Sequence, residues 1–224
     1  MADDQRTGRV FGALFIITFL TSIPAALLFA PVLQDPAGYL AGGGSDTQIH
    51  VAAFLEFLLI ISNVGTAVVL YPIAMRRYPT LAIAFVAARI MESVFIASGV
   101  MFVLAIVALR HEAPQAVDVG VSLAALKDLS FLFGPGLVVP IGNGLILGYL
   151  MYRSGLVPRR MAWFGLIGGP LLLIGQLGVL FDVWDAGSAA RLLVVPEAIW
   201  ELFVGFYCAL RGFRRDSPIL TGEP

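Results

Sequence analysis

The sequence places an arginine and a glutamate, Arg89 and Glu92, one helical turn apart inside the apolar run Leu81–Leu109. A charged side chain at the centre of a bilayer costs about 2.5–3.5 kcal/mol on insertion scales. The i,i+3 spacing puts both groups on one helix face, where each can neutralise the other. We therefore expect the pair to face a protein interior rather than lipid, as part of a buried polar site.

Other ionisable side chains interrupt three further apolar segments. Counted at about 1.5 Å per residue from the expected outer helix ends, Glu56 lies roughly 9 Å deep and Lys127 and Asp128 about 9–11 Å deep. Glu197 and Glu201, spaced i,i+4, lie about 10–16 Å deep by the same rise. With Arg89 and Glu92 in the middle to outer part of their helix, four helices would bring ionisable groups to similar heights in the outer half of the bilayer.

This set contains more acids than bases, five against two. At least one carboxyl should therefore be protonated, unless a cation is bound or water reaches the group. A neutral buried carboxyl beside an ion pair suits general acid–base chemistry or proton-coupled transport. The alternative is a salt-bridge network that only fixes helix packing. We predict proton-transferring roles for Glu56, Glu92, Asp128 and Glu201.

Substrate contacts are predicted for Arg89, Lys127, Phe95 and Phe131. Lys127 and Asp128 are adjacent, so their side chains point about 100° apart and cannot both face one cavity. We expect Asp128 to point inward and Lys127 to extend to the outer interface.

The depth of Glu197 in the bilayer depends on where the last helix begins, and the sequence allows more than one start. Arg191 and Pro196 are compatible with a helix that begins close to Glu197, which would put that carboxyl near the outer interface. Glu201 is the preferred site residue for this reason.

Metal and cofactor sites receive little support, and we predict no cofactor. His50 and His111 lie at expected outer helix ends, and Cys208 is the only cysteine, so a zinc or haem site is weakly supported. A carboxylate-rich Mg²⁺, Mn²⁺ or Ca²⁺ site stays open. The amides Asn63, Asn143 and Gln176 are expected to form interhelical hydrogen bonds and not to act as ligands.

The elements that must position these groups are membrane-spanning helices. The composition is 59% hydrophobic and 13% charged, whereas soluble proteins average about 25% charged. Six apolar segments give an all-α, six-span helical bundle in a single domain, residues 1–224. Their expected bounds are 9–30, 50–71, 80–109, 121–151, 161–181 and 190–212. The first is about 21 residues, longer than the roughly 7–15 apolar residues of a signal peptide.

Basic residues in the short connections set the expected orientation. With six spans, ten arginines fall on one side: Arg6, Arg9, Arg76, Arg77, Arg153, Arg159, Arg160, Arg211, Arg214 and Arg215. Only Arg110 and Arg191 lie near helix ends on the other side. The positive-inside rule then places both termini in the cytoplasm. The near-exclusive use of arginine over lysine suggests a bacterium, so we expect a multi-pass protein of a bacterial inner membrane.

Glycine and proline mark special backbone positions. Pro135 and Pro140 should break or kink the fourth helix. The stretch Pro31–Thr47, rich in Pro, Gly and Asp, is expected to be a flexible external connection. Gly144 with Gly148, and Gly165 with Gly169, allow close helix approach, which we expect within the chain, although the same spacing would serve a homo-oligomer.

The chain resembles a bacterial family of integral membrane proteins catalogued as domain of unknown function 4386. The resemblance covers nearly the whole chain and brings no established activity, but implies a compact helical bundle in the cytoplasmic membrane. It rests on Glu56 and the stretch from Phe57 to Tyr71-Pro72, Arg89-x-x-Glu92, Lys127-Asp128-x-x-Phe131-x-x-Gly134-Pro135, Ser154–Arg159, Trp163-x-Gly165-Leu166-Ile167-Gly168, Pro196-x-Ala198-x-x-Glu201, and Arg211-Gly212-Phe213.

Three functions are compatible with these features. The first is an intramembrane enzyme that performs acid–base chemistry on a lipid or isoprenoid-like substrate. The second is a small proton-coupled transporter or channel, for which Asn63, Asn143 and Gln176 would supply a thin inward path. The third is a non-catalytic lipid-binding or scaffold protein with membrane lipids as partners. The net charge of −1 gives no field that would attract nucleic acid.

Overall fold

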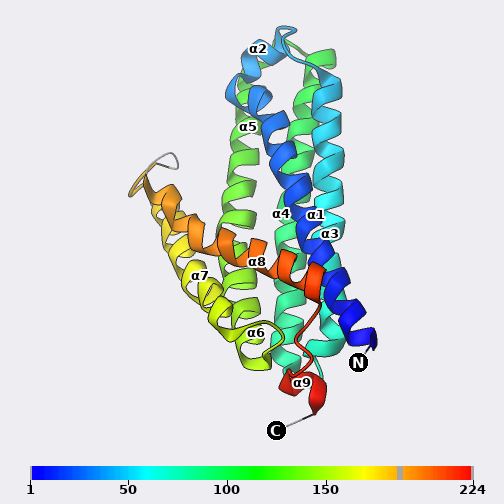
Figure 1. Ribbon diagram of the computed structural model, residues 1–224. Helices are drawn as coiled ribbons and strands as arrows, with labels where there is room; N and C mark the ends of the chain where they lie inside the picture. Colours follow the sequence, from blue (N-terminus) through cyan, green and yellow to red (C-terminus); the bar gives the residue numbers. More distant parts are fainter. Residues whose placement is uncertain (1, 186–188, 223–224) are drawn as a thin grey trace.

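The computed structural model describes residues 2–185 and 189–222, and the regular elements in this part of the chain are all helices (Figure 1). Six of the helical runs are long and apolar enough to cross a membrane, which confirms the predicted six-span all-α fold. The elements are α1 (Ala2–Gln34), α2 (Pro36–Leu40), α3 (Asp46–Ala74), α4 (Pro79–Glu112), α5 (Val117–Phe131), η1 (Leu132–Val138), η2 (Pro140–Leu147), α6 (Gly148–Ser154), α7 (Arg159–Leu180), η3 (Ala189–Val194), α8 (Val195–Arg211) and α9 (Pro218–Thr221).

Four upright helices stand side by side, and two inclined helices complete the molecule. The upright set is α1, α3, α4 and the long run α5–η1–η2–α6, whereas α7 leans away from this set and α8 runs obliquely across it to the lower part of α1 (Figure 1). Both termini, the α3–α4 turn and the α6–α7 turn lie at the lower end of Figure 1. The segments that carry the ten arginines of the short connections therefore share one end, as a six-span arrangement requires.

Of the expected break or kink in the fourth span, the break is absent, but the winding of the helix changes at its prolines. Residues 132–138 and 140–147 are wound as π-helix, with Pro135 inside the first run and Pro140 at the start of the second. Proline has no N–H and its ring clashes with the carbonyl four residues earlier. The wider π turn relieves that clash and releases backbone carbonyls. One of them, Asn143 O, accepts from Trp200 Nε1 at 2.9 Å.

The connection after α1 is ordered, contrary to the expectation of a flexible loop. Asp35 caps the short helix α2 by accepting from Gly38 N–H at 2.8 Å, and Tyr39 is buried. Asp46 accepts from the Tyr39 hydroxyl at 2.5 Å and from Arg110 Nη1 at 2.8 Å. Burial, reinforced by the bond to Asp46, raises the pKa of Tyr39 to about 12. The hydroxyl therefore stays protonated and holds the cap in place.

Two apolar cores lie at the two ends of the upright helices. The upper core packs around Phe29, Tyr39 and Ile106, and the lower core around Phe85 and Trp200. Between them lie the buried polar side chains of the spans, which include Thr18, Glu56, Ser62, Asn63, Thr66, Arg89, Glu92, Ser93, Lys127, Ser130 and Asn143. Apolar packing thus closes both ends of a polar middle layer.

Glycines let α7 pack tightly against the π-helical run. A Cβ on Gly144 would lie 2.5 Å from Gly169 Cα, and one on Gly148 would lie 3.3 Å from Leu166 N. Real Cβ atoms do not come so close to backbone without a shift of the chain, so Gly144 is required at the contact. This confirms that the predicted small-residue spacing serves packing within the chain.

Candidate functional site

A cavity of about 490 Å³ lies between the upper and lower cores, and we call it the chamber. It is bordered by α1, α3, α4, α5, η1, η2, α7 and α8. All seven ionisable residues singled out from the sequence line it: Glu56, Arg89, Glu92, Lys127, Asp128, Glu197 and Glu201. The structure therefore brings together charged groups from four spans, although the first of them, Glu56, and the last, Glu201, are far apart in sequence.

Their heights are less uniform than expected. Arg89 lies 10 residues after the start of α4 at Pro79 and 23 residues before its end at Glu112. At a rise of about 1.5 Å per residue, Arg89 lies nearer to the lower end of α4 than to its upper end. Glu56, by contrast, lies 10 residues from the upper start of α3 at Asp46. The chamber thus extends across the middle of the molecule instead of occupying only its outer half.

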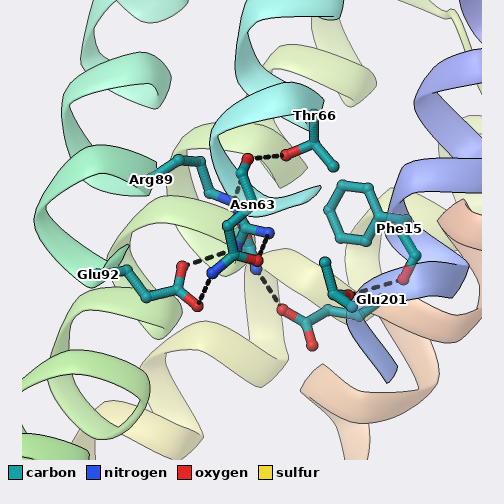
Figure 2. A network of polar contacts seen from close by, with 8 residues as sticks. Phe15, Asn63, Thr66, Arg89, Glu92 and Glu201 are labelled. Carbon is teal, nitrogen blue, oxygen red and sulfur yellow. Dashed lines mark hydrogen bonds and ion pairs between the residues drawn. The ribbon is translucent and has the colours of Figure 1, made fainter. Parts of the chain in front are cut away.

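Arg89 is the hub of a hydrogen-bond network between α4, α3 and η2 (Figure 2). Its Nη1 donates to Glu92 Oε2 at 2.7 Å and to Asn143 Oδ1 at 3.2 Å. Its Nη2 donates to Asn63 Oδ1 at 2.5 Å, and its Nε to Asn63 O at 3.4 Å. Asn63 Nδ2 in turn donates to Glu92 Oε1 at 2.9 Å. Both Glu92 oxygens and four of the five guanidinium N–H groups are thereby occupied.

Asn143 connects this network to α8. Its Oδ1 accepts from Arg89 and its Nδ2 donates to Glu201 Oε1, so the amide bridges the two residues. The buried indole of Trp200, a residue of α8, donates to the backbone carbonyl of Asn143 and fixes it in place. In Figure 2, Asn63 lies at the centre, with Arg89 and Glu92 on one side and Glu201 on the other. The predicted interhelical roles of Asn63 and Asn143 are confirmed.

Lys127 and Glu56 form a second buried pair. The Lys127 ammonium donates to both Glu56 oxygens at 2.9 Å, and Nζ lies 5.2 Å from the centre of the Phe29 ring. Lys127 is only 7% exposed, so the expectation that it extends to the outer interface is wrong. The rotation of α5 is decided by Glu56 across the chamber, because a buried carboxylate needs a partner.

Asp128, which follows Lys127 on α5, is the more exposed of the two residues. Its residue is exposed, and it lines both the chamber and a neighbouring groove. The expectation that Asp128 points into the interior is wrong, because Asp128 is exposed and lies at the mouth of the chamber. A molecule that passes from the groove into the chamber would nevertheless pass Asp128.

Glu197 is more deeply buried than the sequence reading allowed. It is 1% exposed, and neither carboxyl oxygen has a hydrogen-bond partner in the described part of the chain. The absence of a side chain on Gly168 makes room for it, because a Cβ there would lie 2.5 Å from Glu197 N and 2.9 Å from Glu197 Oε2. Helix α8 begins at Val195, two residues before Glu197, as the sequence allowed, and the side chain is nevertheless enclosed by protein. An unpartnered buried carboxyl is costly, so Glu197 is a candidate functional residue.

A groove of about 910 Å³ runs between α5 and α7 and joins the chamber. The two share Asp128, Phe131, Leu172, Gln176 and Val194 as lining residues. Its lining residues come mainly from α5 and α7, and α7 leans away from the upright helices in Figure 1. Its wall is mostly apolar, with Phe131 56% exposed. Phe131 lines both cavities, and its predicted contact with a substrate stays a prediction.

Phe95 lies elsewhere. It stacks on Phe133 with ring centres 6.0 Å apart, and its Cβ packs where a side chain on Gly134 would come. It is not among the residues that line the chamber or the groove. Its aromatic ring serves the packing of α4 against η1.

Helix α1 supplies a wall of the chamber that the sequence reading missed. Phe15, Phe19, Ser22, Phe29 and Leu33 line the chamber. The Phe15 ring also lies against the Arg89 guanidinium, 5.4 Å from ring centre to Cζ, and α1 thereby covers the network (Figure 2). Their spacing of four, three, seven and four residues follows a heptad seam, a signal that was available in the sequence.

The charged groups are not arranged as a metal site. Among the described residues, no three His, Cys, Asp or Glu side chains are grouped as metal ligands would be. His50 is exposed, and His111 contacts Asp46 at 2.7 Å at the upper end of the bundle. The described residues thus contain no group of ligands for the carboxylate-rich cation site that the sequence left open.

Comparison with known proteins gives the family and nothing finer. No curated protein and no solved structure matches the chain. A family model does match, over a range that contains every residue of the chamber. That model is described as Domain of unknown function (DUF4386) and matches residues 10–212, so the chain is a member of this family of membrane proteins.

Proposed function

We propose that this protein admits a lipid-like amphiphile from the bilayer and carries out acid–base chemistry on its head group inside the chamber. The observation that carries the proposal is the continuity between a charged chamber and an apolar groove on the lipid-facing side. A polar head would reach the carboxyls while the tail stays in the groove between α5 and α7. Pockets of roughly 300–1,000 Å³ are typical of small-molecule sites, and the chamber falls in this range.

Glu201 is the proposed proton donor and acceptor. It is partly accessible, it lines the chamber, and Asn143 fixes only one of its two oxygens. General acid–base catalysis needs such a positioned carboxyl within reach of the substrate and able to exist in both protonation states. Asp128, at the mouth, is placed to exchange that proton with the groove.

Glu56 and Glu92 are proposed to act differently from Glu201. Each already accepts hydrogen bonds from a buried cation, Lys127 or Arg89, and would have to give up that partner to take a proton. In this proposal they hold the two cations in place. Arg89 then orients Glu201 through Asn143.

The charge bias of the two ends sets the proposed placement in the cell. We place the arginine-rich lower end in the cytoplasm of a bacterium, with both termini there, because short basic connections are retained on that side. The groove then opens toward the outer leaflet.

The experiment is a comparison of membrane lipids from cells that express equal amounts of wild type and of Glu201→Gln. Wild type should change the level of at least one amphiphile, measured by mass spectrometry of lipid extracts, and Glu201→Gln should abolish the change. Glu112→Gln, at an exposed position at the end of α4, is the matched control and should behave as wild type. Identical lipid profiles in all strains, with no amphiphile retained by the purified protein, would refute the proposal.

Proton-coupled transport is a second candidate, favoured by the π-helical fourth span. Non-helical or loosely wound segments at membrane depth line cavities in many transporters. The lower core, with Phe85, Leu150 and Trp200 fully buried, closes the cytoplasmic side of the chamber in this conformation. Purified protein in liposomes that dissipates a pH gradient, and loses this activity as Glu201→Gln, would favour transport over an enzyme.

A further inference from the structure

Resting on the proposed function, we infer that the head group bound in the chamber is a primary amine, held as an ammonium ion between Glu197 and Glu201. The inference assigns Glu197 a ligand-binding role. It follows from which charges in the chamber have partners within the protein and which have none.

The bases of the chamber are already committed. Arg89 donates four hydrogen bonds to Glu92, Asn63 and Asn143. Lys127 donates to both oxygens of Glu56. An anionic head group would therefore find no free cation and would meet additional carboxyls. This excludes a phosphate or carboxylate as the preferred head group.

The acids of α8 are in the opposite situation. Once Glu92 and Glu56 are set against Arg89 and Lys127, Glu197 and Glu201 are left in the chamber without a basic partner among the described residues. The Coulomb repulsion between them is relieved when a cation lies between them. A cation supplied by the ligand is the direct complement of this site.

The geometry fits an ammonium group in particular. Residues i and i+4 of a helix hold their Cβ atoms about 5–6 Å apart on one face, so both carboxyls can converge on one nitrogen. Both Glu197 oxygens lack a partner, and so does Glu201 Oε2, since Asn143 uses only Oε1. These three acceptors match the three N–H donors of a primary ammonium. A quaternary ammonium has no N–H to offer them.

The way in suits a single apolar chain. Val194 and Leu172 line both the chamber and the α5–α7 groove. Val194 directly precedes α8, the helix that carries Glu197 and Glu201. A long-chain amine would place its nitrogen at Glu197 and Glu201 and its chain along Phe131. Asp128 at the mouth would attract the cation on entry.

The test uses three probes with the same tail and different heads: dodecylamine, 1-dodecanol and dodecanoate. Full-length protein in phosphatidylcholine nanodiscs at neutral pH is titrated with each probe, and bound probe is counted by native mass spectrometry. Wild type should bind dodecylamine at least about tenfold more tightly than dodecanol, because charge-assisted hydrogen bonds are stronger than neutral ones. Dodecanoate should bind most weakly.

The double variant Glu197→Gln/Glu201→Gln should lose the preference for the amine while its affinity for dodecanol stays within about twofold. Retained dodecanol binding also reports that the variant is folded. If it does not fold, each single variant should reduce the preference about tenfold. The double variant Glu112→Gln/Asp118→Asn, at exposed upper positions, removes the same charge outside the chamber and should keep the wild-type preference.

The outcomes separate this inference from the proposed function. Binding of all three probes with equal affinity would overturn the amine inference and leave the amphiphile chamber standing. An amine preference that survives in Glu197→Gln/Glu201→Gln would overturn it as well, since the cation would then bind elsewhere. Failure of every probe to bind would refute the proposed function itself.

Discussion

The α4 wall and the α8 wall of the chamber present acids in opposite states. On α4, Glu92 contacts Arg89 and Asn63, and both of its oxygens are occupied. On α8, Glu197 is equally buried and has no partner in the described residues, and Glu201 has only the amide of Asn143. The difference teaches that burial alone does not make a carboxyl functional. A paired acid joins two helices, whereas an unpaired one is where we propose that a ligand binds.

Removal of the hub should have the largest effect. Arg89→Ala leaves Glu92 buried without its cation, so we expect a loss of about 3–5 kcal/mol in the free energy of unfolding. The loss should appear as a lower Tm of the purified protein in detergent. Arg89→Ala/Glu92→Gln should recover part of it, because the unpaired charge is removed. An unchanged Tm for Arg89→Ala would mean that α4 does not depend on the pair.

The α8 wall should respond in activity instead of stability. Glu201→Gln keeps the shape of the side chain and can still accept from Asn143, so the Tm should stay close to wild type. Turnover of the substrate should fall by about 10²–10⁴-fold, the usual contribution of a general acid or base. Turnover is measured under saturating substrate once it is identified from the lipid comparison. Full activity in Glu201→Gln would move the proton-transfer role to another residue.

The second ion pair should behave like the first, with a smaller effect. Lys127→Met leaves Glu56 without the two hydrogen bonds from the ammonium, and we expect a loss of about 1.5–3 kcal/mol. A double-mutant cycle with Glu56→Gln, followed by thermal unfolding, should give a coupling free energy of at least about 1 kcal/mol. Additive effects of the two substitutions would show that the contact adds no stability.

The smallest effect has the opposite sign and sharpens the comparison most. Glu197→Gln replaces an unpartnered buried acid with a neutral amide, so we expect the free energy of unfolding to rise by up to about 1 kcal/mol or to stay unchanged. Glu92→Gln, the matched change on α4, should lower it because Arg89 loses its counter-ion. Thermal unfolding of both variants under the same conditions tests this. If Glu197→Gln destabilises the protein as much as Glu92→Gln, the acids of α4 and α8 contribute to stability in the same way and the comparison fails.

Much of the site could be predicted because single helices carry local information. The i,i+3 spacing of Arg89 and Glu92 brings them together in any helix, and their cost in lipid requires a protein interior. The same reasoning brought ionisable groups from four helices to one region, but it sent Lys127 to the outer interface and left the depth of Glu197 open, whereas both line the chamber. The interhelical roles of Asn63 and Asn143 also followed, because amides at membrane depth need partners.

The rotation of α5 could not be predicted. Lys127 and Asp128 differ by one position, so either can face inward, and the outcome depends on Glu56 of α3, 71 residues before Lys127 in sequence. The prolines of the fourth span likewise did not show in advance that the helix would continue as π-helix. Phe95 was misplaced because a ring on α4 can pack against η1 as well as face the chamber.

The sequence by itself determined the six spans, their shared basic end and the acids and bases that must avoid lipid, because these follow from apolar length, charge and helical spacing. Only the tertiary structure decided which acids keep a partner. Pairing across helices requires atoms within about 3 Å, and that depends on helix rotation and on glycine contacts such as Gly168 against Glu197. The unpaired carboxyls of α8, on which the function is proposed to depend, are a property of the packing.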